Sequence, residues 1–364
     1  GIVPVAWPSL GSRGLQQGPG QRAVSTACTG LQSRWPGGAL CDPCHTTSFL
    51  TAASFLGWSL PLVGQDYLEI LSSWYCSFGK CCETGDCRIA NNITGLELDL
   101  NRRLHGQHLA KDVILKAVQG FLETPQPEKA LALSFHGWSG TGKNFVARMI
   151  ADHLYRDGLK SECVKVFISL FHFPHPKYVD LYKVQLKKQI SETVQLCKQS
   201  LFIFDEAEKL HSGLLDAIKP YVDHYDSIDE VDYRRSIFLF LSNIGGNIIS
   251  QVTLDFWRAG RAREEITMEY LEQHLRLELL ESTGVAHGLW SHMVSHAKER
   301  LWLPTQGNCH VKLCVRDAFL ARSLPYTEEV LDEVVRMMVF IPEEKLFSAQ
   351  GCKSVSHRIN YFLP

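Results

Sequence analysis

The chain has 364 residues, of which 45% are apolar and 21% are charged, and its formal net charge is −2. This is the balance of an ordinary globular protein, with enough apolar side chains for the cores of two or three domains. The nearly neutral charge argues against a nucleic-acid-binding protein, which normally carries a basic patch.

The N-terminal segment 1–56 is predicted to be disordered. Gly1–Cys44 is rich in Gly, Pro, Ser and Gln and shows no sustained hydrophobic period. Thr46–Gly64 is apolar and uncharged, but two glycines and a proline interrupt it, so it does not predict a membrane-spanning helix. It suits either a buried irregular segment or a signal or anchoring segment. Since the chain opens with Gly and no signal-peptide pattern, we expect a missing or altered native N-terminus.

Seven of the twelve cysteines in the chain precede residue 137, and four of these seven lie in the cysteine-rich region 57–95. The crowded run Cys76-SFGK-Cys81-Cys82-ETGD-Cys87 favours disulfides in an oxidising compartment. Zinc is the alternative, because Cys41-Asp-Pro-Cys44-His45 resembles half of a zinc site, although no second C-x-x-C pair is present. The glycosylation sequon Asn92-Ile93-Thr94 lies beside the cysteines, and together they indicate the secretory pathway.

Two helical stretches are predicted before the first strand. Asp66–Tyr75 is compatible with a short helix, and Leu96–Leu122 has apolar residues at helical spacing. Thr124-Pro125-Gln126-Pro127 ends the second stretch.

From residue 130 short apolar runs alternate with amphipathic stretches. The apolar runs predict strands at Ala130–Phe135, Cys163–Ser169, Ser200–Phe204 and Ser236–Leu241. The amphipathic stretches predict helices at Lys143–Tyr155, Tyr178–Cys197, Glu264–Glu281 and Thr327–Phe340. Continuous apolar strands separated by helices indicate a parallel sheet covered on both faces, so the fold class is α/β. We assign the α/β domain to 96–304 and a smaller C-terminal helical lid to 305–364.

A glycine-rich loop joins the first predicted strand to the next helix. It has the G-x-x-x-x-G-K pattern of a P-loop and consists of Gly137, Trp138, Ser139, Gly140, Thr141, Gly142, Lys143 and Asn144. Its glycines allow amide N–H groups to turn toward phosphate oxygens, and the helix N-terminus adds a favourable field. Lys143 supplies a charge that reaches the β- and γ-phosphates. The flanking strand and helix argue against a chance glycine turn, so we expect this loop to bind ATP.

Carboxylate and amide side chains complete the expected site. Asn144 stands where most P-loops have the Ser or Thr that holds Mg²⁺, and an amide oxygen can also coordinate that cation. Asp205 and Glu206 follow an apolar strand, at the sheet edge where ligands of α/β folds bind. We expect Asp205 and Asn144 to hold Mg²⁺ and Glu206 to activate water as a general base, although an Asp-Glu pair alone would equally suit a helix start. Asn243, after another strand, is expected to orient water, and the alternative is an Asn that caps a turn.

These elements in this order resemble an AAA+ ATPase, and their details resemble the torsin family, above all its vertebrate torsin-3 branch. The resemblance covers roughly Gly57 to Pro364. It is carried by the P-loop with Asn144, Phe171-His-Phe-Pro-His-Pro176, Phe204-Asp-Glu-Ala-Glu-Lys209, Ser242-Asn243, Cys81-Cys82 and Gly351-Cys352-Lys353.

The resemblance implies an ATPase in the lumen of the endoplasmic reticulum or nuclear envelope that associates peripherally with membranes. It also implies a homo- or hetero-oligomeric ring and a membrane-anchored activator with an ATPase-like lumenal domain. Carried over by position, Glu206 is the hydrolytic carboxylate, Asn243 is sensor 1 and Lys353 is sensor 2. Cys314 and Cys352 match a redox-active disulfide. Torsins take their arginine finger from a partner, and we interpret five arginines here as solvated or salt-bridged surface residues: Arg234, Arg235, Arg258, Arg261 and Arg263.

Segment 285–308 departs from the family pattern. The family has a long apolar-aromatic stretch there that supplies the fifth strand, whereas here only Leu301-Trp302-Leu303 is a plausible strand core, ended by Pro304. The sequence leaves open whether a fifth strand forms.

The favoured hypothesis is a torsin-like ATPase that couples hydrolysis to work on protein or membrane-linked partners. The alternative is a scaffold controlled by nucleotide and redox state, with little or no turnover. Glu206 favours the enzyme, whereas Asn144, the missing arginine finger and the altered fifth-strand segment favour the scaffold.

Overall fold

The computed structural model describes residues 86–281, 299–304, 306–341 and 346–362. The chain divides into two compact units, 1–61 and 62–364, and every described residue belongs to the second. The expected disordered segment 1–56, the apolar stretch Thr46–Gly64 and the short helix Asp66–Tyr75 lie outside the described residues, as do all cysteines before Cys87.

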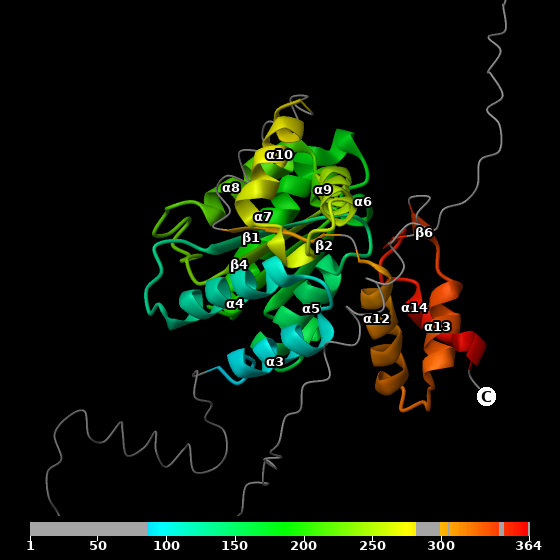
Figure 1. Ribbon diagram of the computed structural model, residues 1–364. Coiled ribbons are helices and arrows are strands. Elements are labelled where there is room, and N and C mark those ends of the chain that lie inside the picture. Colours follow the sequence, from blue (N-terminus) through cyan, green and yellow to red (C-terminus); the bar gives the residue numbers. More distant parts are fainter. Residues whose placement is uncertain (1–85, 282–298, 305, 342–345, 363–364) are drawn as a thin grey trace, which may run out of the picture. The chain divides into compact units, whose positions relative to one another are not determined.

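The centre of the described unit is a five-stranded parallel sheet with the order β2-β3-β4-β1-β5 (Figure 1). The strands are β1 (Leu131–His136), β2 (Val164–Ile168), β3 (Leu201–Asp205), β4 (Ile237–Ser242) and β5 (Glu299–Trp302). The parallel sheet confirms the predicted α/β class. The fifth strand, which the sequence left open, pairs with β1 through Leu133↔Glu299 and Phe135↔Leu301.

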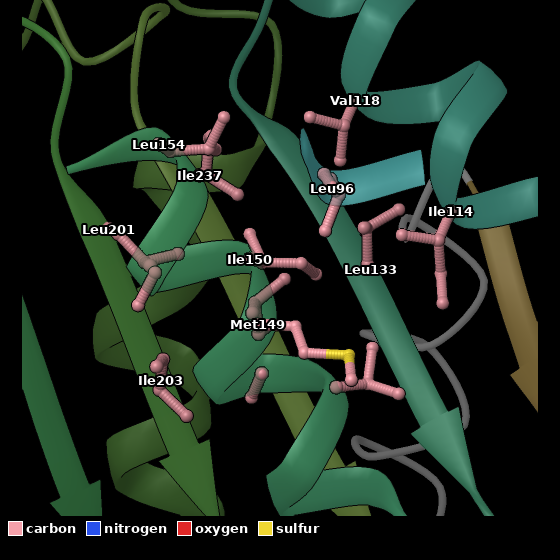
Figure 2. Packing of buried hydrophobic residues seen from close by; sticks show 14 of the residues in the cluster. Leu96, Ile114, Val118, Leu133, Met149, Ile150, Leu154, Leu201, Ile203 and Ile237 are labelled. Carbon is pink, nitrogen blue, oxygen red and sulfur yellow. The ribbon is translucent and has the colours of Figure 1, made fainter. Parts of the chain in front are cut away.

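Helices cover both faces of the sheet because the strand side chains alternate between two apolar cores. One core lies between the sheet and helices α3 (Ile93–Arg103), α4 (His108–Glu123) and α5 (Lys143–Leu154). In Figure 2, Leu133, Ile203 and Ile237 lie around Met149 and Ile150 of α5. The second core holds Phe202 and Phe204 of β3 against α7 (Val179–Leu196) and α8 (Ser212–Val222).

The remaining elements are short or C-terminal. After β2 come α6 (Ser169–His172) and the 3₁₀ turn η3 (Pro176–Tyr178), and after β3 comes the 3₁₀ turn η4 (Ala207–Lys209). Helix α9 (Gly246–Arg258) packs with α10 (Met268–Glu281). The C-terminal part consists of α12 (Asn308–Ala321), α13 (Glu328–Arg336), the hairpin β6 (Phe340–Ile341) and β7 (Phe347–Ser348), α14 (Val355–Arg358) and the 3₁₀ turn η6 (Ile359–Phe362). Its helices enclose a separate apolar cluster. The domain limits 96–304 and 305–364 stay predictions.

Some helices differ from the sequence-based expectation. The stretch Leu96–Leu122 is two helices, α3 and α4, and α10 begins at Met268 rather than at residue 264. Helices α6, α8 and α9 were not predicted, and α12 and α14 lie within the expected helical lid, where no separate bounds were predicted for them. Helix α8 contains Pro220, which removes one backbone donor and normally argues against a helix interior.

Two disulfides join described residues. Cys314 and Cys352 are bonded, as the family resemblance implied, with their α-carbons 6.1 Å apart. Cys163 and Cys197 form a second disulfide, which the sequence did not indicate, with α-carbons 5.5 Å apart. It links the residue before β2 to the residue after α7. Within the described ranges, no helix has both the length and the hydropathy needed to cross a membrane.

Candidate nucleotide-binding site

The P-loop runs from the end of β1 to the first turn of α5. Three of its residues, Gly137, Gly140 and Gly142, have φ of 150°, 82° and 112°, which side-chain-bearing residues rarely adopt. Gly142 is the N-cap of α5, so the helix N-terminus faces the loop. The loop therefore has the backbone freedom and the helix field that phosphate binding needs.

The ammonium group of Lys143 is buried and joins the loop to the sheet. Its Nζ donates to the carbonyl oxygens of Gly137 (2.7 Å) and Trp138 (2.9 Å) and to Oδ1 of Asn243 (2.9 Å). Burial lowers the pKa of Lys143 to about 8, an effect that the nearby carboxylates of Glu208 and Asp205 oppose. The lysine is therefore still mostly charged at neutral pH but loses its proton in mildly alkaline solution.

The two expected metal ligands lie against each other. Nδ2 of Asn144 donates to Oδ2 of Asp205 at 2.7 Å, across 61 residues of sequence. Amide and carboxylate oxygens are hard donors of the kind that Mg²⁺ takes in proteins, so the two residue types fit the cation, and the amide of Asn144 would turn its oxygen toward the metal. The backbone carbonyl of Asp205 accepts from the hydroxyl of Ser169, which fixes the end of β3.

Glu206 follows the metal-ligand position in a strained conformation. Its φ of 53° is left-handed, which costs a residue with a side chain on the order of 1 kcal/mol. Among the described residues its carboxylate makes no hydrogen bond, so the group is available to a water molecule. Strain of this kind is found at sites where function fixes a side-chain position.

The structure also identifies Glu208 as a member of the site. Nδ2 of Asn243 donates to Oε1 of Glu208 at 2.9 Å while Oδ1 of the same amide accepts from Lys143. Oε2 of Glu208 is buried and has no partner among the described residues. Glu208 is the last residue of Asp205-Glu206-Ala207-Glu208, and only the first two acids of this run were predicted to act at the site.

The C-terminal segment lies directly on the P-loop. Nε1 of Trp138 donates to the carbonyl of Ala349 at 3.1 Å. A Cβ added to Gly140 would collide with the carbonyl of Gln350. Lys353 is exposed, and its charge lowers the pKa of Lys143, which places the two cations near each other. The structure thus brings the expected sensor lysine and the P-loop together.

Two buried side chains that the sequence did not single out support this junction. Nε2 of Gln107 donates to the carbonyls of Thr141 (2.8 Å) and Pro304 (2.9 Å), which ties α4 to the P-loop and to the end of β5. Oε1 of Gln306 accepts from the backbone N–H of Cys352 at 3.1 Å. The P-loop, the sheet and the segment that carries Lys353 are therefore held in one network.

Arg263 corrects one sequence-based interpretation. It was expected to be a surface residue, but its guanidinium donates to the backbone carbonyls of Gly106 and Pro304, and burial lowers its pKa to about 10. Arg234 and Arg261 do form exposed salt bridges, with Asp232 and Glu265 respectively.

The sequon is accessible and has a structural role. Asn92 is exposed and is the N-cap of α3, where its Oδ1 accepts from the backbone N–H of Gly95 at 2.8 Å. A cap of this kind is worth about 1 kcal/mol. Its amide nitrogen therefore lies at the surface, where a glycan could be attached.

Comparison with known proteins finds similarity along most of the chain. A family model described as Torsin matches residues 76–204, and one described as Torsin-1A, C-terminal domain, matches residues 308–362. Torsin-3A from Homo sapiens is 60% identical over 318 residues, which cover 85% of this chain and 78% of that protein. Torsin-3A from Mus musculus is 56% identical over 375 residues, which cover 99% of this chain and 93% of that protein.

Solved structures show the same fold at low sequence identity. Hsp104 of S. cerevisiae in complex with ADP matches with a TM-score of 0.55 and 16% identity, over 74% of this chain and 46% of that chain. Hsp104 with ATPγS and FITC casein, in its closed state, matches over the same shares of the two chains with a TM-score of 0.50 and 16% identity. This chain thus spans less than half of the Hsp104 chains that it matches.

The depressed pKa of Lys143 predicts a pH-dependent affinity for ATP. Below pH 8 the ammonium is charged and attracts phosphate, and above it the free protein must take up a proton to bind. Between pH 7 and pH 9 we expect ATP affinity to fall about tenfold. Titrations with the Glu206→Gln variant, in which we expect hydrolysis to be impaired, measure this fall. The matched control is the double variant Glu206→Gln/Lys143→Arg. Its arginine stays charged over this pH range, so its affinity for ATP should not change with pH. Equal affinity of the Glu206→Gln variant at both pH values would contradict the assignment.

The Cys314–Cys352 disulfide predicts a coupling between redox state and nucleotide binding. Cys352 follows the segment that contacts Gly140, so reduction should loosen this contact and weaken ATP binding, on the order of fivefold or more. The measurement compares affinity in oxidised and reduced protein. In Cys352→Ser the difference should vanish, and in Cys163→Ser, which opens the other disulfide, it should persist. If reduction has the same effect on the wild type and on Cys352→Ser, the Cys314–Cys352 bond is not the coupling element.

Proposed function

Because this chain belongs to the torsin family and has the AAA+ fold, we propose that it binds ATP with Mg²⁺ and hydrolyses ATP to remodel protein or membrane-linked partners. The observation that carries the proposal is the hydrogen bond from Nζ of Lys143 to Oδ1 of Asn243. It joins the P-loop to the end of β4, beside the contact between Asn144 and Asp205. The matching Hsp104 structure contains ADP, which supports the choice of an adenine nucleotide.

Each residue has a distinct part in the proposed reaction. The backbone N–H groups of Gly137–Asn144 and the ammonium of Lys143 bind the phosphates. Asp205 and Asn144 hold Mg²⁺, which when bound neutralises phosphate charge. Glu206 accepts a proton from the attacking water. Asn243 would orient that water after exchanging one of its two contacts, with Lys143 or with Glu208, for the water.

A partner is part of the proposal because the torsin resemblance implies an arginine finger from outside the chain, and three of the arginines considered for that role already have partners. Arg263 is committed to backbone carbonyls, and Arg234 and Arg261 to carboxylates. An arginine from a neighbouring subunit can raise the rate by several orders of magnitude. We therefore propose a homo- or hetero-oligomeric ring and a membrane-anchored activator with an ATPase-like lumenal domain.

The second candidate function is a nucleotide- and redox-controlled scaffold with little turnover. The specific observation in its favour is that Asn144 donates directly to Asp205, so the metal-ligand carboxylate is already hydrogen-bonded by the residue that replaces the usual Ser or Thr. In a scaffold, ATP would control the contact between the P-loop and the Ala349–Lys353 segment without being hydrolysed.

Two substitutions separate phosphate binding from hydrolysis. Lys143→Ala should weaken ATP binding about a hundredfold, because a charge-assisted contact is lost. Glu206→Gln should keep ATP bound and slow hydrolysis by a factor of about 10²–10⁴. Affinity and turnover are measured in the same buffer, with and without the lumenal domain of a candidate activator.

Glu269→Gln, which changes an exposed glutamate on α10, is the control. Should Glu206→Gln and activated wild type turn over ATP at the same slow rate, the scaffold is the better description.

We further propose that the protein resides in the lumen of the endoplasmic reticulum, where Asn92 carries a glycan. Glycosidase treatment of protein from mammalian cells should increase its electrophoretic mobility. Thr94→Ala is the sharpest control, because it removes the sequon and leaves Asn92 in place as the cap of α3. A protein protected from external protease but insensitive to glycosidase would contradict the glycan.

A further inference from the structure

The side-chain amide of Asn243 lies between a cation and an anion. Its Oδ1 accepts from Nζ of Lys143 at 2.9 Å, and its Nδ2 donates to Oε1 of Glu208 at 2.9 Å. An amide has an acceptor at one end and donors at the other, so only one orientation makes both contacts. The reverse orientation would place N–H groups against the ammonium and an oxygen against the carboxylate. The two charged neighbours therefore determine which way the amide points.

Both partners of the contact between Asn243 and Glu208 are held by their backbones. Glu208 lies in the 3₁₀ turn η4, where Ala207 and Leu210 on either side are buried in the core behind β3. The backbone N–H of Leu210 donates to the carbonyl of Ala207 at 3.1 Å, which closes the turn. The carbonyl of Asn243 accepts from the backbone N–H of Gly246 at 3.1 Å. The contact thus joins two anchored segments.

Bound ATP would act differently on the two neighbours of the amide. The ammonium of Lys143 is attracted by phosphate, so it is the contact that Asn243 gives up when ATP binds. Glu208 has no such attraction, because phosphate and carboxylate repel each other. The contact with Glu208 is then the one that keeps the amide nitrogen turned away from the nucleotide and the oxygen turned toward it.

The choice between oxygen and nitrogen matters for a water molecule that attacks phosphate. An amide oxygen accepts one O–H of the water and leaves the lone pairs of the water available for attack. An amide nitrogen in the same place would donate to a lone pair and occupy it. The orientation seen here is therefore the one that suits hydrolysis.

We propose that Glu208 is a positioning residue, which fixes the amide of Asn243 so that its oxygen accepts a hydrogen bond from the attacking water. The part that concerns water rests on the proposed ATPase, whereas the orientation of the amide does not depend on hydrolysis. Glu206 still accepts the proton, and Glu208 acts only through Asn243.

Thermal unfolding of the full chain without ATP tests the contact. In the wild type, Glu208→Gln should lower the melting temperature by about 2–4 °C, because a charge-assisted hydrogen bond becomes a neutral one. In Asn243→Asp the same substitution should raise the melting temperature, because it replaces one of two facing carboxylates by an amide that donates to the other. An equal fall in both backgrounds would overturn the proposal, since side chains that touch cannot give that result.

Turnover of ATP with an activator tests the positioning role. Glu208→Gln should lower kcat about tenfold through a misplaced water and change KM for ATP by no more than about twofold. In Asn243→Ala, which has no amide to position, adding Glu208→Gln should lower kcat no further. A loss of the same factor in both backgrounds would show that Glu208 acts independently of Asn243 and would overturn the proposal.

The matched control is Lys209→Gln, which changes an exposed charge in the same turn. It should leave kcat unchanged in both backgrounds, and its effect on the melting temperature should be the same with Asn243 and with Asn243→Asp. Absence of turnover in the activated wild type would count against the proposed ATPase. The melting temperatures would still decide whether Glu208 holds the amide, so the two proposals fail separately.

Discussion

The buried charge of Lys143 is the constraint on which the arrangement of the site depends. A buried ammonium without partners would cost several kcal/mol, so it must find oxygen acceptors. Two are carbonyls of the P-loop itself, which closes the loop around the lysine. The third is Oδ1 of Asn243, and Nδ2 of the same amide donates to Oε1 of Glu208. Because Asn243 directly follows β4 and Glu208 follows β3, one hydrogen-bonded chain aligns the ends of two strands with the phosphate-binding loop.

The opposite side of the P-loop is fixed by backbone-to-backbone contact. A Cβ on Gly140 would collide with Gln350, and one on Gly351 would collide with the carbonyl of Gly140, so neither position accepts a larger residue without movement. The segment that makes this contact is held by the Cys314–Cys352 disulfide and by Gln306. The conformation of the P-loop and the position of the C-terminal segment are therefore mechanically linked, which is the physical basis for expecting redox state to affect nucleotide binding.

Helix α7 has one face in the core behind β3 and one face at the surface of the protein. Its inner face belongs to the core behind β3, the strand that delivers Asp205 and Glu206, and its outer face presents Leu181 and Val184. The Cys163–Cys197 bond keeps the two ends of the segment from β2 to α7 together.

Local patterns in the sequence determined the order of the elements and the principal site residues. Apolar runs fixed the places of β1 to β4, and the glycines and lysine of the P-loop identified the strand-loop-helix unit, because these signals depend only on neighbouring residues. The family resemblance added the Cys314–Cys352 pair, which the structure confirms.

Only the tertiary structure decided which distant residues meet. Asn243 lies 100 residues from Lys143, and no local pattern could show that Glu208 would extend their contact or that Arg263 would turn inward. The fifth strand is only four residues long, too short for a periodic signal, and its pairing with β1 defines it. Leu181 and Val184 have the spacing of a buried helix face, yet they are exposed. Spacing shows which side chains share a face, whereas the packing of the whole chain decides which face is buried.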